Sequence, residues 1–147
     1  MLPRRAAMWG LGAYVLILGL IALWPVPVDQ GASDLLLRSL RKLHRWGVPE
    51  WFDYRVLELA ANMVLFIPLG AFVARILGAR LWWGGAAVGF LVSVLIELAQ
   101  LFFLPARFPS VSDVAANTFG AMIGALAALV LMTLSAAVRF RGPPRTL

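Results

Sequence analysis

Residues 81–104 read LWWGGAAVGFLVSVLIELAQLFFL, and this stretch decides the fold class of the chain. Its only charged residue is Glu97. A helix crosses the hydrocarbon core of a bilayer with about 20 largely apolar residues, a length that this stretch reaches. Because its apolar residues are continuous and do not alternate with polar ones, the stretch predicts a membrane-spanning helix and not a strand of a β-barrel.

The rest of the chain has a similar composition. Of its 147 residues, 62% are hydrophobic and 14% are charged, whereas a soluble domain carries about 25% charged residues. This composition excludes an ordinary cytosolic enzyme and a disordered tail, and the absence of cysteine excludes a disulfide scaffold. We expect an all-α fold, one membrane domain over residues 1–147, with four spanning helices at about 8–24, 57–77, 81–104 and 114–138.

The first apolar run has clear boundaries. Arg4 and Arg5 precede it, and Pro25 and Pro27 follow it. Proline lacks a backbone N–H and restricts the residue before it, so a helix end is expected there. Two arginines before an apolar run also occur in cleaved signal peptides, and this alternative stays open. The run is long for the core of a signal peptide, which favours a retained spanning helix.

A short amphipathic helix is expected at about 33–46, in the first outer loop, with Ser33 or Asp34 as its N-cap. Its apolar stripe would consist of Leu36, Leu40, Leu43 and Trp46, widened by Leu35 and Leu37, and its basic side of Arg38, Arg41, Lys42 and Arg45. Such a helix most often lies on the membrane surface. A lid, or a funnel for an anionic substrate, is the alternative. The aromatic residues Trp46, Trp51, Phe52 and Tyr54 predict an interfacial belt.

The net charge of +6 bears on how the chain is oriented in the membrane and on which partners it binds. In a membrane protein, excess lysine and arginine usually set the orientation and contact anionic lipid, so we expect membrane lipids and no nucleic acid as partners. Short loops follow the positive-inside rule most closely. The short link from Arg75 to Arg80 therefore predicts that both termini lie in the cytoplasm.

Polar residues within the apolar runs are the candidate site. Glu97 lies about 10 Å inside the outer end of its helix, since each residue adds about 1.5 Å, and Gln100 shares its face. The same four-residue spacing joins Asp113 to Asn117 in the fourth span and Glu58 to Asn62 in the second. We expect these side chains at similar depth, beneath a loop that contains Arg107.

Small residues continue these faces toward the cytoplasmic end. Gly85 and Gly89 precede Glu97 in steps of four, and Gly120 and Gly124 follow Asn117. Such spacing predicts closely packed helices. A homo-oligomer is also compatible with it.

The predicted cluster has two interpretations. In the first, hydrogen bonds between the polar side chains only fix the register of the helices. In the second, the cluster is an outward-open ligand pocket, in which Glu97 is a candidate general acid or base and Arg107 binds an anion or carboxylate. With a single histidine, His44, and no cysteine, serine triads and zinc sites are excluded. We expect no cofactor and no metal ion, although an oxygen-bound Mg²⁺ is the metal that such residues could hold.

At these residues the chain resembles the VanZ-like family of small bacterial membrane proteins. Residues 62–70 read NMVLFIPLG and residues 97–124 read ELAQLFFLPARFPSVSDVAANTFGAMIG. They are similar to the family's N-x3-F-x-P-x-G and E-x2-Q…R…D-x3-N-x2-G-x3-G elements. The matching positions are Asn62, Phe66, Pro68, Gly70, Glu97, Gln100, Arg107, Asp113, Asn117, Gly120 and Gly124.

The resemblance implies a protein of the bacterial inner membrane with a role in the cell envelope. The family takes its name from a glycopeptide-resistance determinant associated with teicoplanin. A lipid-linked or peptidoglycan-related ligand, bound by Asn62, Glu97, Gln100, Arg107, Asp113 and Asn117, is the expected partner. A membrane enzyme that uses Glu97, and an assembly factor in which the cluster only orders the helices, remain alternatives.

Overall fold

The computed structural model describes residues 3–23, 33–104 and 110–140. Within them it contains α1 (Arg4–Ala22), α2 (Ser33–Arg45), α3 (Tyr54–Leu77), the short 3₁₀ helix η1 (Ala79–Leu81), α4 (Gly84–Phe103) and α5 (Val111–Phe140). Four of these helices, α1, α3, α4 and α5, are long and apolar enough to cross a membrane. The predicted all-α fold, with four spanning helices and one short helix, is confirmed.

The helix boundaries differ from the predicted ones by a few residues. The helix α3 begins at Tyr54 and not at residue 57, because the Asp53 side chain accepts a hydrogen bond from the Val56 N–H and caps it. The helix α4 begins only at Gly84, because η1 forms a separate turn after Gly78, whose φ of 86° ends α3. The prolines that were expected to end α1 lie outside the described residues.

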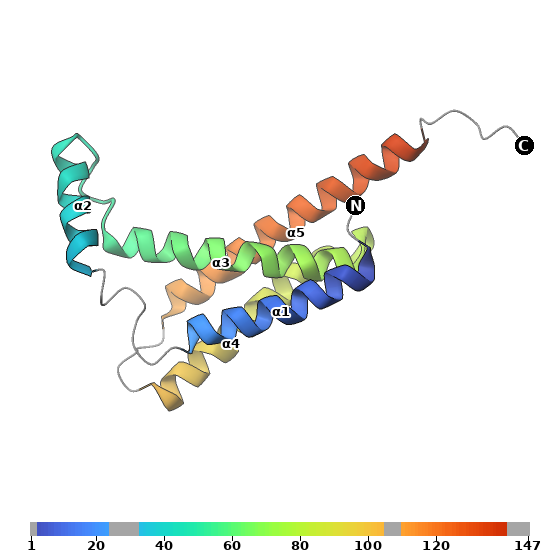
Figure 1. Ribbon diagram of the computed structural model, residues 1–147, viewed down its shortest axis with the longest axis horizontal. Helices are drawn as coiled ribbons and strands as arrows, with labels where there is room; N and C mark the ends of the chain where they lie inside the picture. The colour runs from blue at the N-terminus through green and yellow to red at the C-terminus, as the bar shows by residue number, and fades with distance from the viewer. Residues whose placement is uncertain (1–2, 24–32, 105–109, 141–147) are drawn as a thin grey trace, which may run out of the picture.

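The four long helices run in alternately opposite directions along the chain (Figure 1). The start of α1, the end of α3, the start of α4 and the end of α5 lie at one end of the bundle. At the other end lie the end of α1, the start of α3, the end of α4 and the start of α5, together with α2. We call the latter the α2 end. The link at Arg75–Arg80 and the start of α1 therefore lie together at the opposite end.

Backbone contact joins α3 to α5, the pair of helices with the most extensive interface. A Cβ atom built at Gly120 or Gly124 would overlap the carbonyl groups of Met63 or Ile67, and one at Gly70 would overlap the backbone of Ala121. Lipid tails are as apolar as the helix surfaces, so helices in a membrane associate through such close packing more than through the hydrophobic effect. These glycines therefore permit the central contact of the fold.

The helix α4 approaches α5 in a similar way, through glycine opposite alanine. A Cβ at Gly85 would lie 2.7 Å from that of Ala125, and one at Gly89 would overlap that of Ala121. By contrast, α1 packs on α3 through large side chains. Leu18 is buried, and the Tyr14 hydroxyl donates a hydrogen bond to the Leu65 carbonyl. The helix α1 thus rests on the outside of a tightly packed trio.

The short helix α2 lies steeply across the direction of α3 (Figure 1). Its Leu40 side chain is buried and Leu36 and Leu43 are half-buried, so this part of the predicted apolar side faces the protein. Leu35 and Leu37, which were expected to widen that side, are exposed. The inclusion of Trp46 in this side was wrong. Helix α2 ends at Arg45, and Trp46 is 72% exposed with the Lys42 ammonium 5.0 Å from its ring centre. The predicted caps, Ser33 and Asp34, have side chains outside the described set.

Candidate functional site

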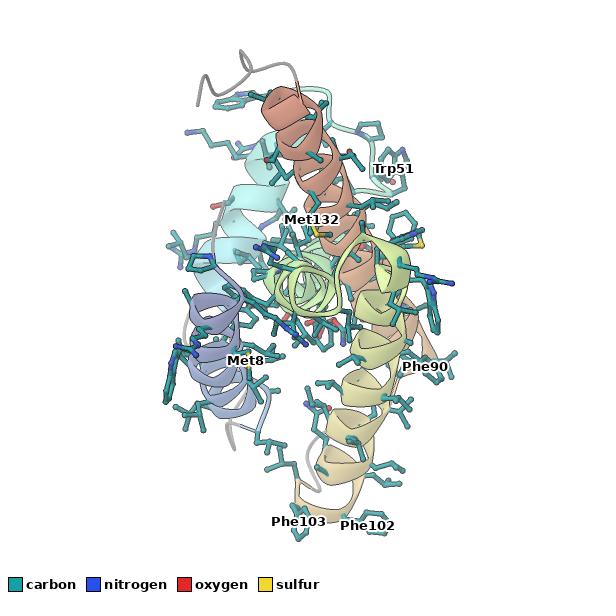
Figure 2. The ribbon with its side chains drawn as sticks, turned by 90° about the vertical axis from the view of Figure 1, so that its right-hand side faces the viewer. Met8, Trp51, Phe90, Phe102, Phe103 and Met132 are labelled. Atoms are coloured by element: carbon teal, nitrogen blue, oxygen red, sulfur yellow. The ribbon has the colours of Figure 1, made fainter. Side chains whose placement is uncertain are left out.

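The polar side chains of α4 face the interior of the bundle. Ser93, Glu97 and Gln100 are 0%, 8% and 8% exposed. On the other side of α4, Leu95, Leu98 and Leu101 are exposed, and Figure 2 shows Phe90, Phe102 and Phe103 pointing away from the other helices. The Glu97 carboxylate is therefore sheltered from the lipid tails, as expected for an ionisable group within a span.

A buried hydrogen bond joins the polar face of α4 to α5. The Asn117 Nδ2 donates to the Ser93 Oγ at 2.9 Å, and the Asn117 side chain is 5% exposed. The other end of the same amide, Oδ1, is buried and accepts no hydrogen bond within the described part of the chain. An amide oxygen without a donor is costly in such surroundings, typically about 1–3 kcal/mol.

The Glu97 carboxylate lies at the amino end of α5. Its Oε2 accepts a hydrogen bond of 2.8 Å from the backbone N–H of Ser110, the residue before α5 begins. The Ser110 carbonyl in turn accepts from the N–H groups of Asp113 and Val114, in the first turn of the helix. A negative charge is favourable at this end of a helix dipole. Glu97 therefore both ties α4 to α5 and places an anion at the α2 end.

Gln100 extends the polar face toward α1. Its Nε2 donates to the carbonyl oxygen of Ala22, the last residue of α1, at 2.8 Å. That carbonyl is one of those that a helix end leaves without an internal partner. We call Ser93, Glu97, Gln100 and Asn117 the polar cluster. It reaches three of the four long helices: α1, α4 and α5.

A chain of hydrogen bonds leads from the polar cluster to the surface. The hydroxyl groups of Ser110 and Ser112 share a hydrogen bond of 2.6 Å, and the Arg55 Nη2 donates to the Ser112 Oγ at 3.3 Å. Arg55 is exposed in the first turn of α3. Through Ser110, which also contacts Glu97, the buried carboxylate is thus connected to an exposed guanidinium.

The predicted site residues are only partly brought together. Glu97, Gln100 and Asn117 lie on facing sides of their helices, whereas Asn62 is half-buried and makes no hydrogen bond to them in the described structure. Asp113 is half-buried in the first turn of α5, next to the Ser110 N-cap. Arg107 lies outside the described residues.

Two residues of this region were not predicted as site residues. Ser93 holds the Asn117 amide, and Arg55 ends the chain of hydrogen bonds. Ser93 could have been found because it lies four residues before Glu97 on the same face. Arg55 carries no such signal, since its partner is in a distant helix.

The chemistry available here is that of hydrogen bonding and of one buried carboxylate. Within residues 3–23, 33–104 and 110–140, no group of three or more acidic or histidine side chains is placed to hold a metal ion. The acceptors of the polar cluster include the Glu97 carboxylate, whose Oε2 accepts from the Ser110 N–H, and the Asn117 Oδ1.

Comparison with known proteins identifies the family. No curated protein and no solved structure gives a significant match. The family model described as VanZ/LLP1 matches residues 11–132, a range that runs from α1 into α5 and contains the whole polar cluster. The predicted resemblance is therefore confirmed, and the chain belongs to the VanZ/LLP1 family.

Proposed function

We propose that this multi-span membrane protein binds a cell-envelope molecule, lipid-linked or derived from the cell wall, at the polar cluster. The observation that carries the proposal is the Asn117 Oδ1, which is buried without a donor in the described structure. A hydrogen-bonded network that served only to hold helices together would gain stability by satisfying this atom. A ligand O–H or N–H would satisfy it.

The surroundings of the polar cluster support a particular ligand chemistry. Both the Asn117 Oδ1 and the Glu97 carboxylate are acceptors, so a ligand rich in hydroxyl and amide groups, such as a sugar or a peptide, is favoured. The opposite side of α4 is apolar and exposed at Leu95, Leu98 and Leu101. A molecule with a polar head and a lipid tail could use both sides. A contribution to teicoplanin resistance is part of this proposal.

An assembly role is the second candidate, and a specific observation favours it. The Ser93–Asn117 and Glu97–Ser110 hydrogen bonds both tie α4 to α5 or to the residue before it. Polar contacts of this kind can hold membrane helices in register. The two candidates differ in whether the polar cluster also recognises something outside the chain.

Replacement of Asn117 by alanine tests the ligand-binding proposal. We expect Asn117→Ala to weaken binding of a peptidoglycan-derived probe by about tenfold, the value of one hydrogen bond of about 1.4 kcal/mol. The probes are muramyl dipeptide and its polyprenyl-pyrophosphate-linked pentapeptide counterpart, titrated calorimetrically against the purified chain in detergent. The matched control is Thr118→Val, which removes a hydroxyl whose partner among the described residues is the Val114 carbonyl. No saturable binding of either probe, or equal weakening by both variants, would overturn the proposal.

We further infer that both termini face the cytoplasm and that the α2 end faces outward. The basic residues Arg4, Arg5, Arg75 and Arg80 support this orientation, because the helix ends that carry them gather at the other end of the bundle (Figure 1).

Single cysteines test the orientation, because the chain contains none of its own. We expect a membrane-impermeant maleimide to label Ser39→Cys, on exposed α2, in intact cells, and Arg80→Cys only after permeabilisation. Labelling is read as a mass shift on a gel. The reverse pattern would contradict the inferred orientation.

A further inference from the structure

A second polar surface, separate from the polar cluster, lies on α2. A shallow groove of about 460 Å³ is lined by Arg38, Arg41 and Arg45. These residues are three and four positions apart, so they share one face of the helix. All three are exposed. Among the described residues, the lining of the groove therefore comes from one face of α2. We call it the arginine groove.

Contacts on the other sides of α2 hold this face outward. The buried Leu40 side chain lies on the opposite side of the helix. At the end of α2, the His44 Nε2 donates to the Phe52 carbonyl oxygen at 3.0 Å. Lys42 extends over the Trp46 ring. The positive charge of the groove thus comes from guanidinium groups, on a helix whose Leu40 side chain is buried.

The chemistry of the arginine groove is that of a phosphate site. A guanidinium is always charged and presents paired N–H donors that match two oxygens of a phosphate. In the described part of the chain, no acidic residue lines the groove to neutralise it. Like charges at such spacings destabilise a helix. An anion in the groove would remove that repulsion.

The position of α2 indicates where the phosphate would come from. The helix lies across the α2 end of the bundle, at a steep angle to the spans (Figure 1), as a helix at the membrane interface does. On α2 and in the segment that follows it, Leu35, Trp46 and Trp51 are exposed apolar or aromatic side chains. Tryptophan is enriched in the headgroup region of a bilayer. We propose that the arginine groove binds the phosphate of an anionic membrane lipid and thereby holds α2 at the membrane surface.

The test measures lipid retention by the purified full-length chain in an uncharged detergent. We expect native mass spectrometry with dioleoylphosphatidylglycerol to show one tightly held lipid. The variant Arg38→Gln/Arg41→Gln/Arg45→Gln should weaken its binding by about tenfold or more, since each basic residue near a phosphate contributes substantially. The control is Arg4→Gln/Arg5→Gln/Arg80→Gln, which removes the same charge from exposed residues elsewhere. It should change binding of that lipid less than about twofold.

Size-exclusion chromatography and circular dichroism verify that both variants fold, which is expected because all six arginines are exposed. Equal loss in the two variants, or no loss in either, would overturn the proposal. A competition separates the two sources of phosphate. If millimolar inorganic phosphate displaces the lipid while sodium chloride of equal ionic strength does not, the groove is a site for free phosphate and the assignment to a lipid fails. None of these outcomes depends on the polar cluster, so ligand binding there can be judged independently.

Discussion

Replacing Gly124 by leucine is expected to prevent the chain from folding. A Cβ atom at this position would overlap the Ile67 carbonyl group and lie 3.0 Å from the Ala71 backbone nitrogen. Both neighbours are backbone atoms of α3, which cannot rotate away as a side chain can. Overpacking a core typically costs about 1–3 kcal/mol even where side chains can adjust. Here the two helices would have to separate along their most extensive interface.

Gly124→Ala should show the same effect in a milder form, as a loss of stability of several kcal/mol. The matched control is Gly12→Ala in α1, where an added Cβ would meet nothing within 4 Å. Alanine is favoured over glycine within a helix by about 1 kcal/mol, so this control should be as stable as the original chain or more stable. Unfolding by increasing dodecyl sulfate, followed by circular dichroism, measures the difference. Equal stability of Gly124→Ala and the unmodified chain would show that α3 and α5 do not touch as described.

The second large effect is expected for Glu97→Gln, which should fold normally and lose the proposed binding of an envelope ligand. The glutamine amide oxygen can still accept the hydrogen bond from the Ser110 N–H. Loss of the favourable placement of the charge at the amino end of α5 should itself cost about 0.3–1 kcal/mol. The affinity for a ligand that donates a hydrogen bond to the carboxylate should fall much more than the stability of the fold. Hydrogen bonds to charged groups are stronger than those to neutral groups.

The readout is teicoplanin susceptibility of a host that expresses the chain, together with binding of the two muramyl probes. Glu50→Gln is the control, since Glu50 is exposed and lies outside the helices. If Glu97→Gln lowers the amount of folded protein in parallel with function, the polar cluster serves assembly. If the original chain converts the lipid-linked probe to a product and Glu97→Gln does not, the protein is an enzyme. Full function in Glu97→Gln would exclude a role of the charge in recognition.

The spanning helices could be predicted from the sequence because the thickness of the bilayer sets the length of an apolar run. The start of α4 could not, since Trp82 and Trp83 are as apolar as the helical residues that follow them. Hydropathy does not distinguish a turn of two tryptophans from the first turn of a helix. The start of α3 depends on one hydrogen bond, which the Val56 N–H donates to the Asp53 side chain and which spacing alone does not reveal.

For the candidate site, the sequence indicated which faces turn inward but not which partners they meet. Four-residue spacing predicted that Glu97 and Asn117 lie on polar faces, and both side chains are buried. Ser110, the partner of Glu97, and Ala22, the partner of Gln100, enter the region through backbone groups, which every residue possesses and which carry no signature in the sequence. The unpaired Asn117 Oδ1 likewise becomes visible only once the helices are placed side by side.

The length of α5 has a consequence for how the protein fits its membrane. With 30 residues, α5 measures about 45 Å, whereas the 20 residues of α4 measure about 30 Å, the thickness of a typical hydrocarbon core. Figure 1 shows the last turns of α5 extending past the other helices. Tilts average only about 20°, which is too little to absorb the surplus. Part of α5 therefore leaves the acyl region. In a thicker bilayer, α4 would become too short for the hydrocarbon core, whereas more of α5 would be covered by it.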